Sequence, residues 1–233
     1  MTDLIVQIAI GAVATILAIT LHEAAHGFAA WALGDDTAKN AGRLSLNPLR
    51  HVDRMGTIIL PGALIIGQLI LLGRIAFLFG WAKPVPVSAW RFRDPRRGMA
   101  LVAAAGPAMN FFLAWLGALA GWLLPHLPPE TMAATVIFLR YFILTNVVLG
   151  LFNLLPIPPL DGGRIAVGIL PLPLAMRWAR LERAGIAIVL LLVFLLPTAA
   201  RQFGVNFDPV GEILNRVLPW TMRLIFNLAG QSV

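Results

Sequence analysis

Long apolar segments alternate with short polar loops along this chain of 233 residues. The apolar segments cover about 4–33, 56–81, 99–124, 133–155 and 184–200, and most of them approach the roughly 20 residues that a bilayer-spanning helix requires. A last stretch, about 210–229, mixes apolar residues with Arg216, Pro219 and Arg223, which is typical of an amphipathic helix at a membrane surface. The pattern predicts an all-α polytopic membrane protein with about four to six hydrophobic segments.

The composition agrees with this class and excludes others. Hydrophobic residues make up 59% of the chain and charged residues 12%, whereas a soluble domain has about 45–50% and about 25%. The formal net charge of +7 comes largely from lysines and arginines between apolar segments, which indicates membrane topology rather than nucleic-acid binding. The absence of cysteine excludes disulfides and thiolate metal sites. We expect one membrane-embedded domain over 1–233, with a core at about 4–170 and C-terminal helices at about 171–233.

The distribution of lysine and arginine predicts the sidedness of the chain. Basic residues occupy the loop after the first segment, the loop before the third and the stretch after the fourth, whereas the loop "PHLPPETM" has none. The positive-inside rule places the basic loops in the cytoplasm. We therefore expect a multi-pass protein of the plasma membrane, in which the third segment leaves the cytoplasmic side and the fourth returns to it.

The second segment, about 56–81, has two interpretations because both of its flanks are basic. In the first, which we favour, it enters and leaves on the cytoplasmic side, with irregular backbone around Pro61, Gly62 and Gly73 buried in protein. In the second, the segment spans the membrane and the charge rule fails once. The sequence leaves both interpretations open.

Three ionisable residues, His22, Glu23 and His26, interrupt the end of the first apolar segment in the sequence "LHEAAH". An ionisable group inside a membrane helix is costly and marks a functional site by default. His22 and His26 are four residues apart, so both imidazoles can reach one tetrahedral metal ion. Glu23 lies about 60° around the helix from His26 and can reach a water at that ion. This is the H-E-x-x-H arrangement of zinc hydrolases; alternatively, the three side chains only hydrogen-bond within the protein.

A catalytic zinc site usually has a third protein ligand, and Asp161 is the best candidate. It follows the fourth apolar segment in "NLLPIPPLDGGR" (153–164). The prolines of this stretch deny helix hydrogen bonds, and Gly162 and Gly163 allow close approach of the backbone. The predicted sidedness brings Asp161 and HEAAH to one depth. Alternatively, Asp161 is a helix cap or turn residue.

Two further histidines are weaker candidates for this site. His126 lies in the loop without lysine or arginine, which we expect on the far face of the membrane. His51 lies on the same face as the end of the first segment, where an imidazole can bind substrate, shuttle protons or bind a second metal. Alternatively, His51 makes a hydrogen bond that fixes its loop.

Taken together, these motifs resemble the site-2 proteases, which are intramembrane zinc metalloproteases. The matching pieces occur in the family's order and are "HEAAHG" (22–27), "GRLSLNPLRHVDRMGT" (42–57), "FGWAKPVPV" (79–87), "AAGPAMN" (104–110) and "NLLPIPPLDGGR" (153–164). The chain resembles the compact branch of the family, which lacks a PDZ domain. The resemblance implies a three-helix catalytic core formed by the HExxH, GPxxN and LDG helices.

The resemblance also implies a role for each matching residue. His22, His26 and Asp161 match the zinc ligands, and Glu23 matches the general base. Asn110 of the GPxxN motif and Asn153 of the NxxP motif are similar to groups that hold the substrate backbone or stabilise the oxyanion. Alternatively, Asn110 makes an interhelical hydrogen bond, which is common in membrane helices.

We therefore expect a zinc-dependent endopeptidase with one Zn²⁺ per chain and an active site towards the cytoplasmic side. Its substrate is expected to be a membrane protein, cleaved within or next to a transmembrane segment, and its other partner is the lipid bilayer. Gly117 and Gly121 form a GxxxG pattern that suits a contact within one chain as well as a dimer, so the oligomeric state stays open. The alternatives are an inactive membrane scaffold of the same fold and a divalent-metal transporter.

Overall fold

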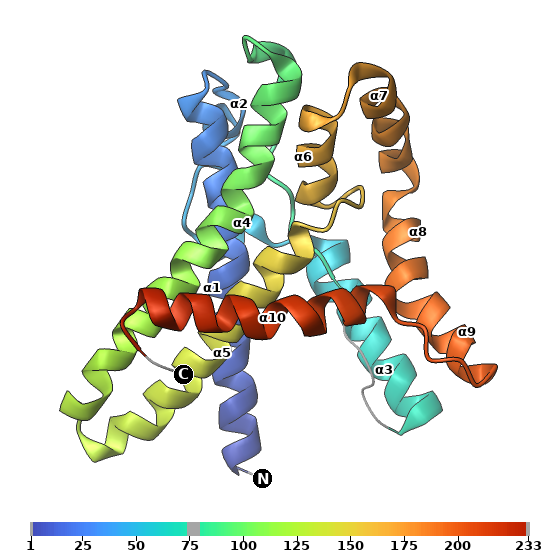
Figure 1. The fold of residues 1–233 in the computed structure, drawn as a ribbon. Coiled ribbons are helices and arrows are strands. Elements are labelled where there is room, and N and C mark those ends of the chain that lie inside the picture. The colour runs from blue at the N-terminus through green and yellow to red at the C-terminus, as the bar shows by residue number, and fades with distance from the viewer. Residues whose placement is uncertain (1, 74–79, 232–233) are drawn as a thin grey trace.

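The computed structural model describes residues 2–73 and 80–231, which are largely helical (Figure 1). No strand occurs within these two ranges. Four helical stretches of the described chain are long and apolar enough to cross a membrane: Val6–Ala32, Pro95–His126, Pro129–Asn153 and Leu172–Gln202. The prediction of an all-α polytopic membrane protein is confirmed.

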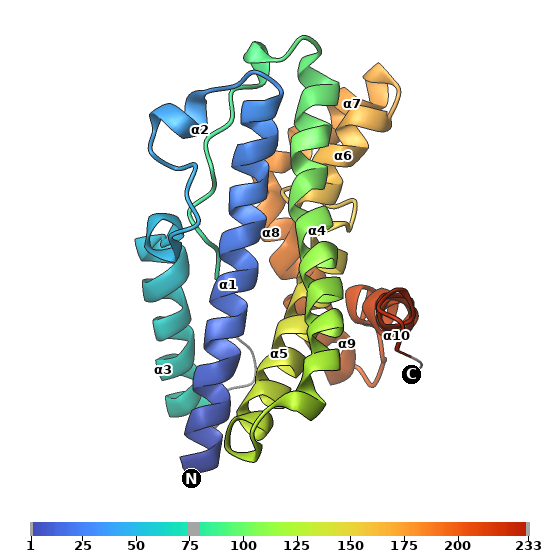
Figure 2. The same ribbon diagram turned by 90° about the vertical axis from the view of Figure 1, so that its left-hand side faces the viewer.

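Three long helices form the centre of the molecule. They are α1 (Thr2–Ala32), α4 (Pro95–Ala120) and α5 (Pro129–Asn153). Each packs against the other two, and α4 runs antiparallel to its neighbours (Figures 1 and 2). Asp94 fixes the start of α4, because its carboxylate accepts hydrogen bonds from the backbone N–H groups of Arg96 and Arg97. A 3₁₀ turn, Gly121–His126, joins α4 to α5.

Small residues allow these helices to approach closely. Ala18 of α1 and Ala114 and Ala118 of α4 are almost completely buried. A side chain at Gly117 would place its Cβ 2.8 Å from Cγ1 of Ile143 on α5. In a membrane, where helices gain little from the hydrophobic effect, such close packing is a main source of association. Gly117 of the GxxxG pattern therefore serves a contact within one chain.

The second apolar segment folds back on itself. A π-helical turn, Arg54–Ile59, leads into α3 (Leu60–Leu72), which has 13 residues and is about 20 Å long. Together with the π-helical turn it forms the apolar helix Arg54–Ile70, which is shorter than the four candidate membrane spans and than the roughly 20 residues that a spanning helix requires. The backbone N–H of Trp81 donates to the carbonyl of Gly56 at 3.1 Å, so the two ends of the segment meet. This closure supports re-entry, although residues 74–79 of the expected segment lie outside the described residues.

After this segment the chain runs beside α1 without regular structure. Residues 80–88 are extended and lead towards the start of α4 (Figure 2). Pro84 and Pro86 favour this conformation, because proline fixes φ and supplies no N–H donor. The extended segment 80–88 thus lies between the second apolar segment and the core.

The C-terminal half adds shorter helices. They are α6 (Asp161–Ile169), α7 (Leu172–Arg180), α8 (Gly185–Leu190), α9 (Leu196–Gln202) and α10 (Pro209–Leu228). Of these, α6 and α10 pack against the three central helices. The segment expected at 184–200 is part of the longer helical stretch Leu172–Gln202. Helix α10 lies across α4 and α5 (Figure 1). It is amphipathic, with Thr221 and Ile225 buried and Arg216 and Arg223 exposed; its place at a membrane surface stays a prediction.

Candidate active site

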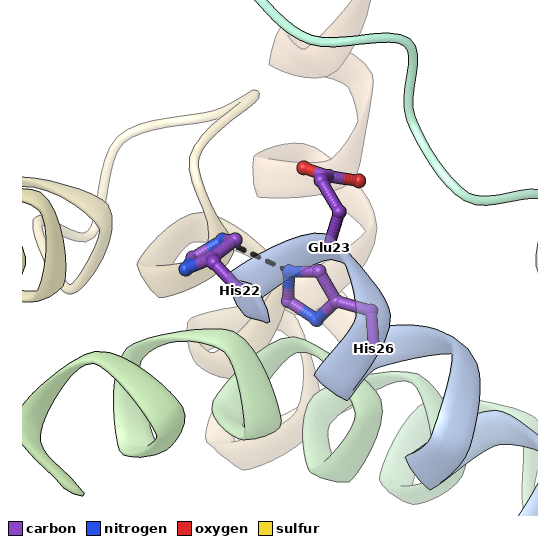
Figure 3. Close-up of side chains that lie close together, drawn as sticks. All are labelled: His22, Glu23 and His26. Atoms are coloured by element: carbon purple, nitrogen blue, oxygen red, sulfur yellow. Dashed lines mark hydrogen bonds between the residues drawn. The ribbon is translucent and has the colours of Figure 1, made fainter. Parts of the chain in front are cut away.

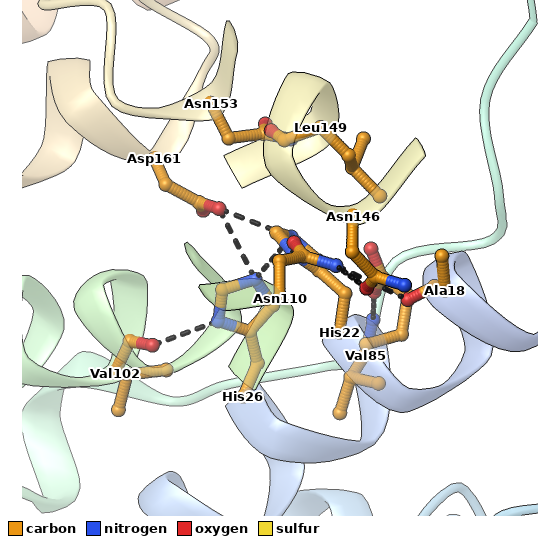
Figure 4. Close-up of polar contacts among 11 residues, drawn as sticks. Ala18, His22, His26, Val85, Val102, Asn110, Asn146, Leu149, Asn153 and Asp161 are labelled. Atoms are coloured by element: carbon orange, nitrogen blue, oxygen red, sulfur yellow. Dashed lines mark hydrogen bonds and ion pairs between the residues drawn. The ribbon is translucent and has the colours of Figure 1, made fainter. Parts of the chain in front are cut away.

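Helix α1 brings His22 and His26 together on the face that meets α4. Their Nε2 atoms are 3.1 Å apart. Each ring is held by its other nitrogen: Nδ1 of His22 lies 2.6 Å from Oδ1 of Asn110, and Nδ1 of His26 lies 2.7 Å from the carbonyl of Val102 (Figure 4). Because both partners are oxygen acceptors, Nδ1 carries the proton in each ring. The Nε2 lone pairs are thereby left to bind a metal ion.

Asp161 reaches the same point from the start of α6. Its Oδ2 lies 3.1 Å from Nε2 of His22 and 3.3 Å from Nε2 of His26. This oxygen is buried and accepts no hydrogen bond, since both facing nitrogens present lone pairs. Ligands of a tetrahedral zinc ion, with bonds of about 2.0–2.1 Å, are roughly 3.3–3.4 Å apart. The three side chains therefore fit a zinc ion, which would also satisfy the buried carboxylate.

Glycines allow α6 to bring Asp161 this close. A Cβ at Gly162 would overlap the carbonyl oxygens of Leu154 and Leu155, and one at Gly163 would lie 2.7 Å from the nitrogen of Pro158. The "DGG" sequence is therefore a packing requirement of the turn that follows α5.

The far end of α6 is held by Arg96 of α4. Its guanidinium donates to the carbonyls of Val167, Gly168 and Leu170 at 3.2, 3.1 and 2.6 Å. These carbonyls belong to the end of a helix, where they lack helical partners. Arg96 thus fixes the helix that carries Asp161.

Gly106 of the GPxxN motif lies directly against the two imidazoles. A Cβ at this position would be 2.5 Å from Cε1 of both His22 and His26. Any side chain here would displace the rings. The glycine therefore provides the space in which the two Nε2 atoms converge.

Glu23 stands apart from the two rings, on the cavity side of α1 (Figure 3). Its carboxylate has an oxygen within 4.8 Å of the ligand nitrogens of His22 and His26. Oε2 accepts a hydrogen bond from the backbone N–H of Val85 at 3.2 Å. This position suits a base that acts on a water beside the metal site without being a ligand.

A cavity of about 380 Å³ opens over these residues. Its lining contains Glu23, Asp161 and Asn153, and the rest is mainly apolar. The apolar residues come from α1, the extended segment, α4, α5, the turn before α6, and α8, and include Ile19, Val85, Met99, Phe152, Leu160 and Val189. An apolar cavity with few polar groups is the usual form of a binding site.

The two asparagines expected to contact substrate differ in their placement. Asn110 is completely buried, and its amide group donates to Oδ1 of Asn146 at 2.9 Å while its oxygen holds His22. It does not line the cavity, so its geometry supports orientation of His22 rather than the expected oxyanion contact. Asn153 lines the cavity, and its amide donates to the carbonyl of Leu149 at 3.0 Å.

His51 lies outside the cavity lining. It is buried, its Nε2 lies 2.8 Å from the carbonyl of Ser45, and its own carbonyl accepts from the N–H of Lys83. These contacts fit the alternative in which His51 fixes its loop. Asn146, which sequence reasoning missed, is completely buried and holds Asn110. Its one signal is an amide side chain in the middle of an apolar segment.

Comparisons with known proteins identify the family. The sequence profile of peptidase family M50 matches residues 124–196, which include Asn153 and Asp161. The chain is 40% identical over 186 residues to YwhC of Bacillus subtilis (strain 168), which is named as a candidate zinc metalloprotease, and the match covers 78% of each chain.

More distant relatives carry the same description. The chain is 36% identical over 148 residues to Rip2 of Mycobacterium tuberculosis (strain H37Rv) and 35% identical over 149 residues to Rip2 of Mycolicibacterium smegmatis. Both are named as candidate zinc metalloproteases, and the matches cover 63% of this chain and 52% of Rip2. No solved structure matches the chain. Because the motifs, the family profile and the identity to YwhC agree, the chain belongs to peptidase family M50, the family of the site-2 proteases.

Proposed function

We propose that this protein is a zinc-dependent endopeptidase that cleaves a peptide bond within or next to a transmembrane segment of a membrane protein. One observation carries the proposal: Nε2 of His22, Nε2 of His26 and Oδ2 of Asp161 converge within 3.3 Å of one another beside Glu23. Membership of a peptidase family and the names of YwhC and Rip2 support both the metal and the reaction.

Each residue then has a distinct task. His22, His26 and Asp161 hold one zinc ion per chain. The bound ion would polarise the scissile carbonyl and lower the pKa of water from about 15.7 towards 7. Glu23 accepts the proton of the attacking water and later donates it to the leaving amine. Asn153 contacts the substrate backbone or the oxyanion from the cavity wall, whereas Asn110 orients His22.

The orientation of the site supports cleavage near the cytoplasmic face of the plasma membrane. Helix α2 (Thr37–Asn40), the start of α4 and α7 lie at the same end of the molecule, to which the last turns of α1 point (Figure 1). These elements carry basic residues: Lys39, Arg96, Arg97, Arg177 and Arg180. The positive-inside rule assigns this end to the cytoplasm.

The shape of the cavity suits an unwound apolar peptide. The carbonyl groups of a helical substrate are hydrogen-bonded and shielded, so the substrate must extend locally before cleavage. The extended segment 80–88 forms one wall of the cavity, and its valines offer an apolar surface for side chains that come from lipid. A transmembrane segment supplies such side chains.

The test is metal content together with cleavage of a model single-span substrate in detergent. Wild type is expected to hold about one zinc and to cleave, Glu23→Gln to keep zinc without cleaving, and Asp161→Ala to bind zinc poorly. Absence of zinc in the wild type, or wild-type cleavage by Glu23→Gln, would overturn the proposal. Zinc retention with no cleavage of any single-span substrate by wild type would favour the inactive scaffold.

A further inference from the structure

Asp35 is a completely buried carboxylate outside the zinc-binding cluster. It lies in the turn between α1 and α2, with an exposed fraction of 0%. Its Oδ1 accepts hydrogen bonds from the N–H and the hydroxyl of Thr37 at 3.0 and 2.5 Å, and Nε of Arg91 is 3.7 Å away. Its Oδ2 accepts from the backbone N–H of Ser88 at 2.6 Å. Asp35 therefore joins the end of α1 to the end of the extended segment.

The same segment is bound to α1 at a second point, inside the active site. Three residues before Ser88, the N–H of Val85 donates to Glu23. Between the two contacts, a Cβ at Gly27 would lie 3.2 Å from Cγ1 of Val85, so the missing side chain lets the segment lie against the helix. Two carboxylates, those of Glu23 and Asp35, thus bind the backbone of the extended segment.

The other end of the segment is bound independently of Asp35. The N–H of Trp81 donates to Gly56, the N–H of Lys83 donates to His51, and the guanidinium of Arg43 donates to the carbonyl of Lys83 at 2.6 Å. Asp35 accepts the backbone N–H at the C-terminal end of the segment, where none of these contacts reaches. The Thr37 hydroxyl, which donates to Asp35, also lies 2.9 Å from the Ser88 hydroxyl, so Asp35 and Thr37 form one attachment for this end of the segment.

A buried carboxylate is an expensive way to close a turn, because desolvation of the charge must be offset by hydrogen bonds. Asp35 receives these from two separate elements, Thr37 on one side and Ser88 on the other. Its two oxygens give it an acceptor for each element, which an amide side chain does not have. An aspartate at position 35 therefore suits a link between α2 and the extended segment better than a cap of α2 alone.

We propose that Asp35 is a positioning residue that fixes the extended segment 80–88 against α1, so that the Val85 N–H meets Glu23 and the apolar wall faces the substrate. The inference rests on the proposed function for its effect on cleavage. Its structural part, the attachment of the segment, is testable without any substrate.

The test compares Asp35→Asn with Asp36→Asn. The two changes remove the same charge from adjacent residues, and the Asp36 side chain makes no capping hydrogen bond to α2. Asp35→Asn is expected to keep zinc, to accelerate amide exchange at Val85 and Ser88, and to raise KM. A displaced substrate wall is expected to lower kcat/KM by about ten- to a hundredfold. Asp36→Asn is expected to match wild type.

Loss of folded protein alone would lower kcat in proportion to zinc content and would leave KM unchanged. A second pair of variants covers a folding failure of Asp35→Asn. Ser88→Pro removes the N–H that donates to Asp35. Ser88→Ala keeps this N–H and removes only the hydroxyl that bonds Thr37. Only Ser88→Pro should therefore reproduce the faster exchange at Val85.

Wild-type exchange and KM in both Asp35→Asn and Ser88→Pro would overturn the inference. Failure of the proposed function would appear differently, as absence of cleavage in the wild type with the exchange pattern intact.

Discussion

Nδ1 of His22 lies 2.6 Å from Oδ1 of Asn110, which comes from a different helix. Asn110 is therefore expected to act on zinc affinity, whereas Asn153 acts on cleavage. Asn110→Ala should weaken zinc binding about 10- to 100-fold, the usual cost of losing a partner of a metal-bound histidine. Asn153→Ala should keep zinc and lose kcat. Competition with a chelator measures the first effect; equal zinc affinity in the two variants would contradict the assignment.

Gly106→Ala should abolish the metal site, because the added methyl group would occupy the space of both imidazoles. Zinc content after purification is the measurement, and a loss of stability of about 1–3 kcal/mol is expected from the overlap. Gly67→Ala on α3 is the matched control, since a Cβ there meets no atom within 4 Å. A zinc-loaded Gly106→Ala protein would show that the rings are less confined than described.

Arg96→Ala should weaken zinc binding without touching a ligand. It removes three hydrogen bonds to the end of α6 and so frees the helix that carries Asp161. We expect about a tenfold rise in the zinc Kd, equivalent to about 1.4 kcal/mol. Arg97→Ala is the control: the side chain is 83% exposed and pairs only loosely with Asp94, at 3.5 Å. If the two variants bind zinc equally, α6 is held by other contacts.

The Asp35 attachment should be sensitive to acid. Burial alone would raise the pKa of Asp35, but hydrogen bonds from Ser88 and Thr37 and the nearby charge of Arg91 hold the pKa below its ordinary value of 3.8. The unfolded chain then binds the proton more readily, so the stabilisation is complete above about pH 4 and is lost as pH falls through the lower folded value. The difference in Tm between wild type and Asp35→Asn should therefore shrink between about pH 5 and about pH 3. A constant difference would argue against an ionised Asp35.

The closure between Gly56 and Trp81 predicts that both flanks of the second segment lie on one side of the membrane. The chain has no cysteine, so single substitutions report cleanly. Leu49→Cys and Trp90→Cys, at positions 78% and 77% exposed, should be labelled from the same side. Leu123→Cys, in the turn after α4, should be labelled from the other side. Labelling of positions 49 and 90 from opposite sides would mean that the segment spans the membrane.

The sequence was most informative where chemistry and hydrophobicity conflict. An imidazole or carboxylate in an apolar run is conspicuous, so His22, Glu23 and His26 were found without a structure. Asp161 followed from the prolines and glycines around it. The start of α4 at Pro95 and the extension of the last long helical stretch back to Leu172 were missed, because charged residues such as Arg97 and Arg177 lower local hydropathy at helix ends that still form regular hydrogen bonds.

The groups that orient the site were harder to find for a physical reason. The carbonyl of Val102 and the N–H of Val85 belong to the backbone, and every residue carries such groups. Asn146 and Asp35 have ordinary local sequences, one in an apolar helix and one in a "GDD" turn. Their roles depend on partners that are distant in the chain, which only the packing of α1, α4, α5 and the extended segment reveals.

The two histidines that we propose as zinc ligands are both oriented by one neighbour, helix α4, through Asn110 and the carbonyl of Val102. A slide of α4 along α1 would break both bonds together. Zinc occupancy and the alignment of the two helices are therefore linked, and the coupling is the same in either direction. Since bilayer thickness acts on helix tilt, a membrane that strains this alignment should release zinc more readily, and a zinc-loaded protein should resist that strain.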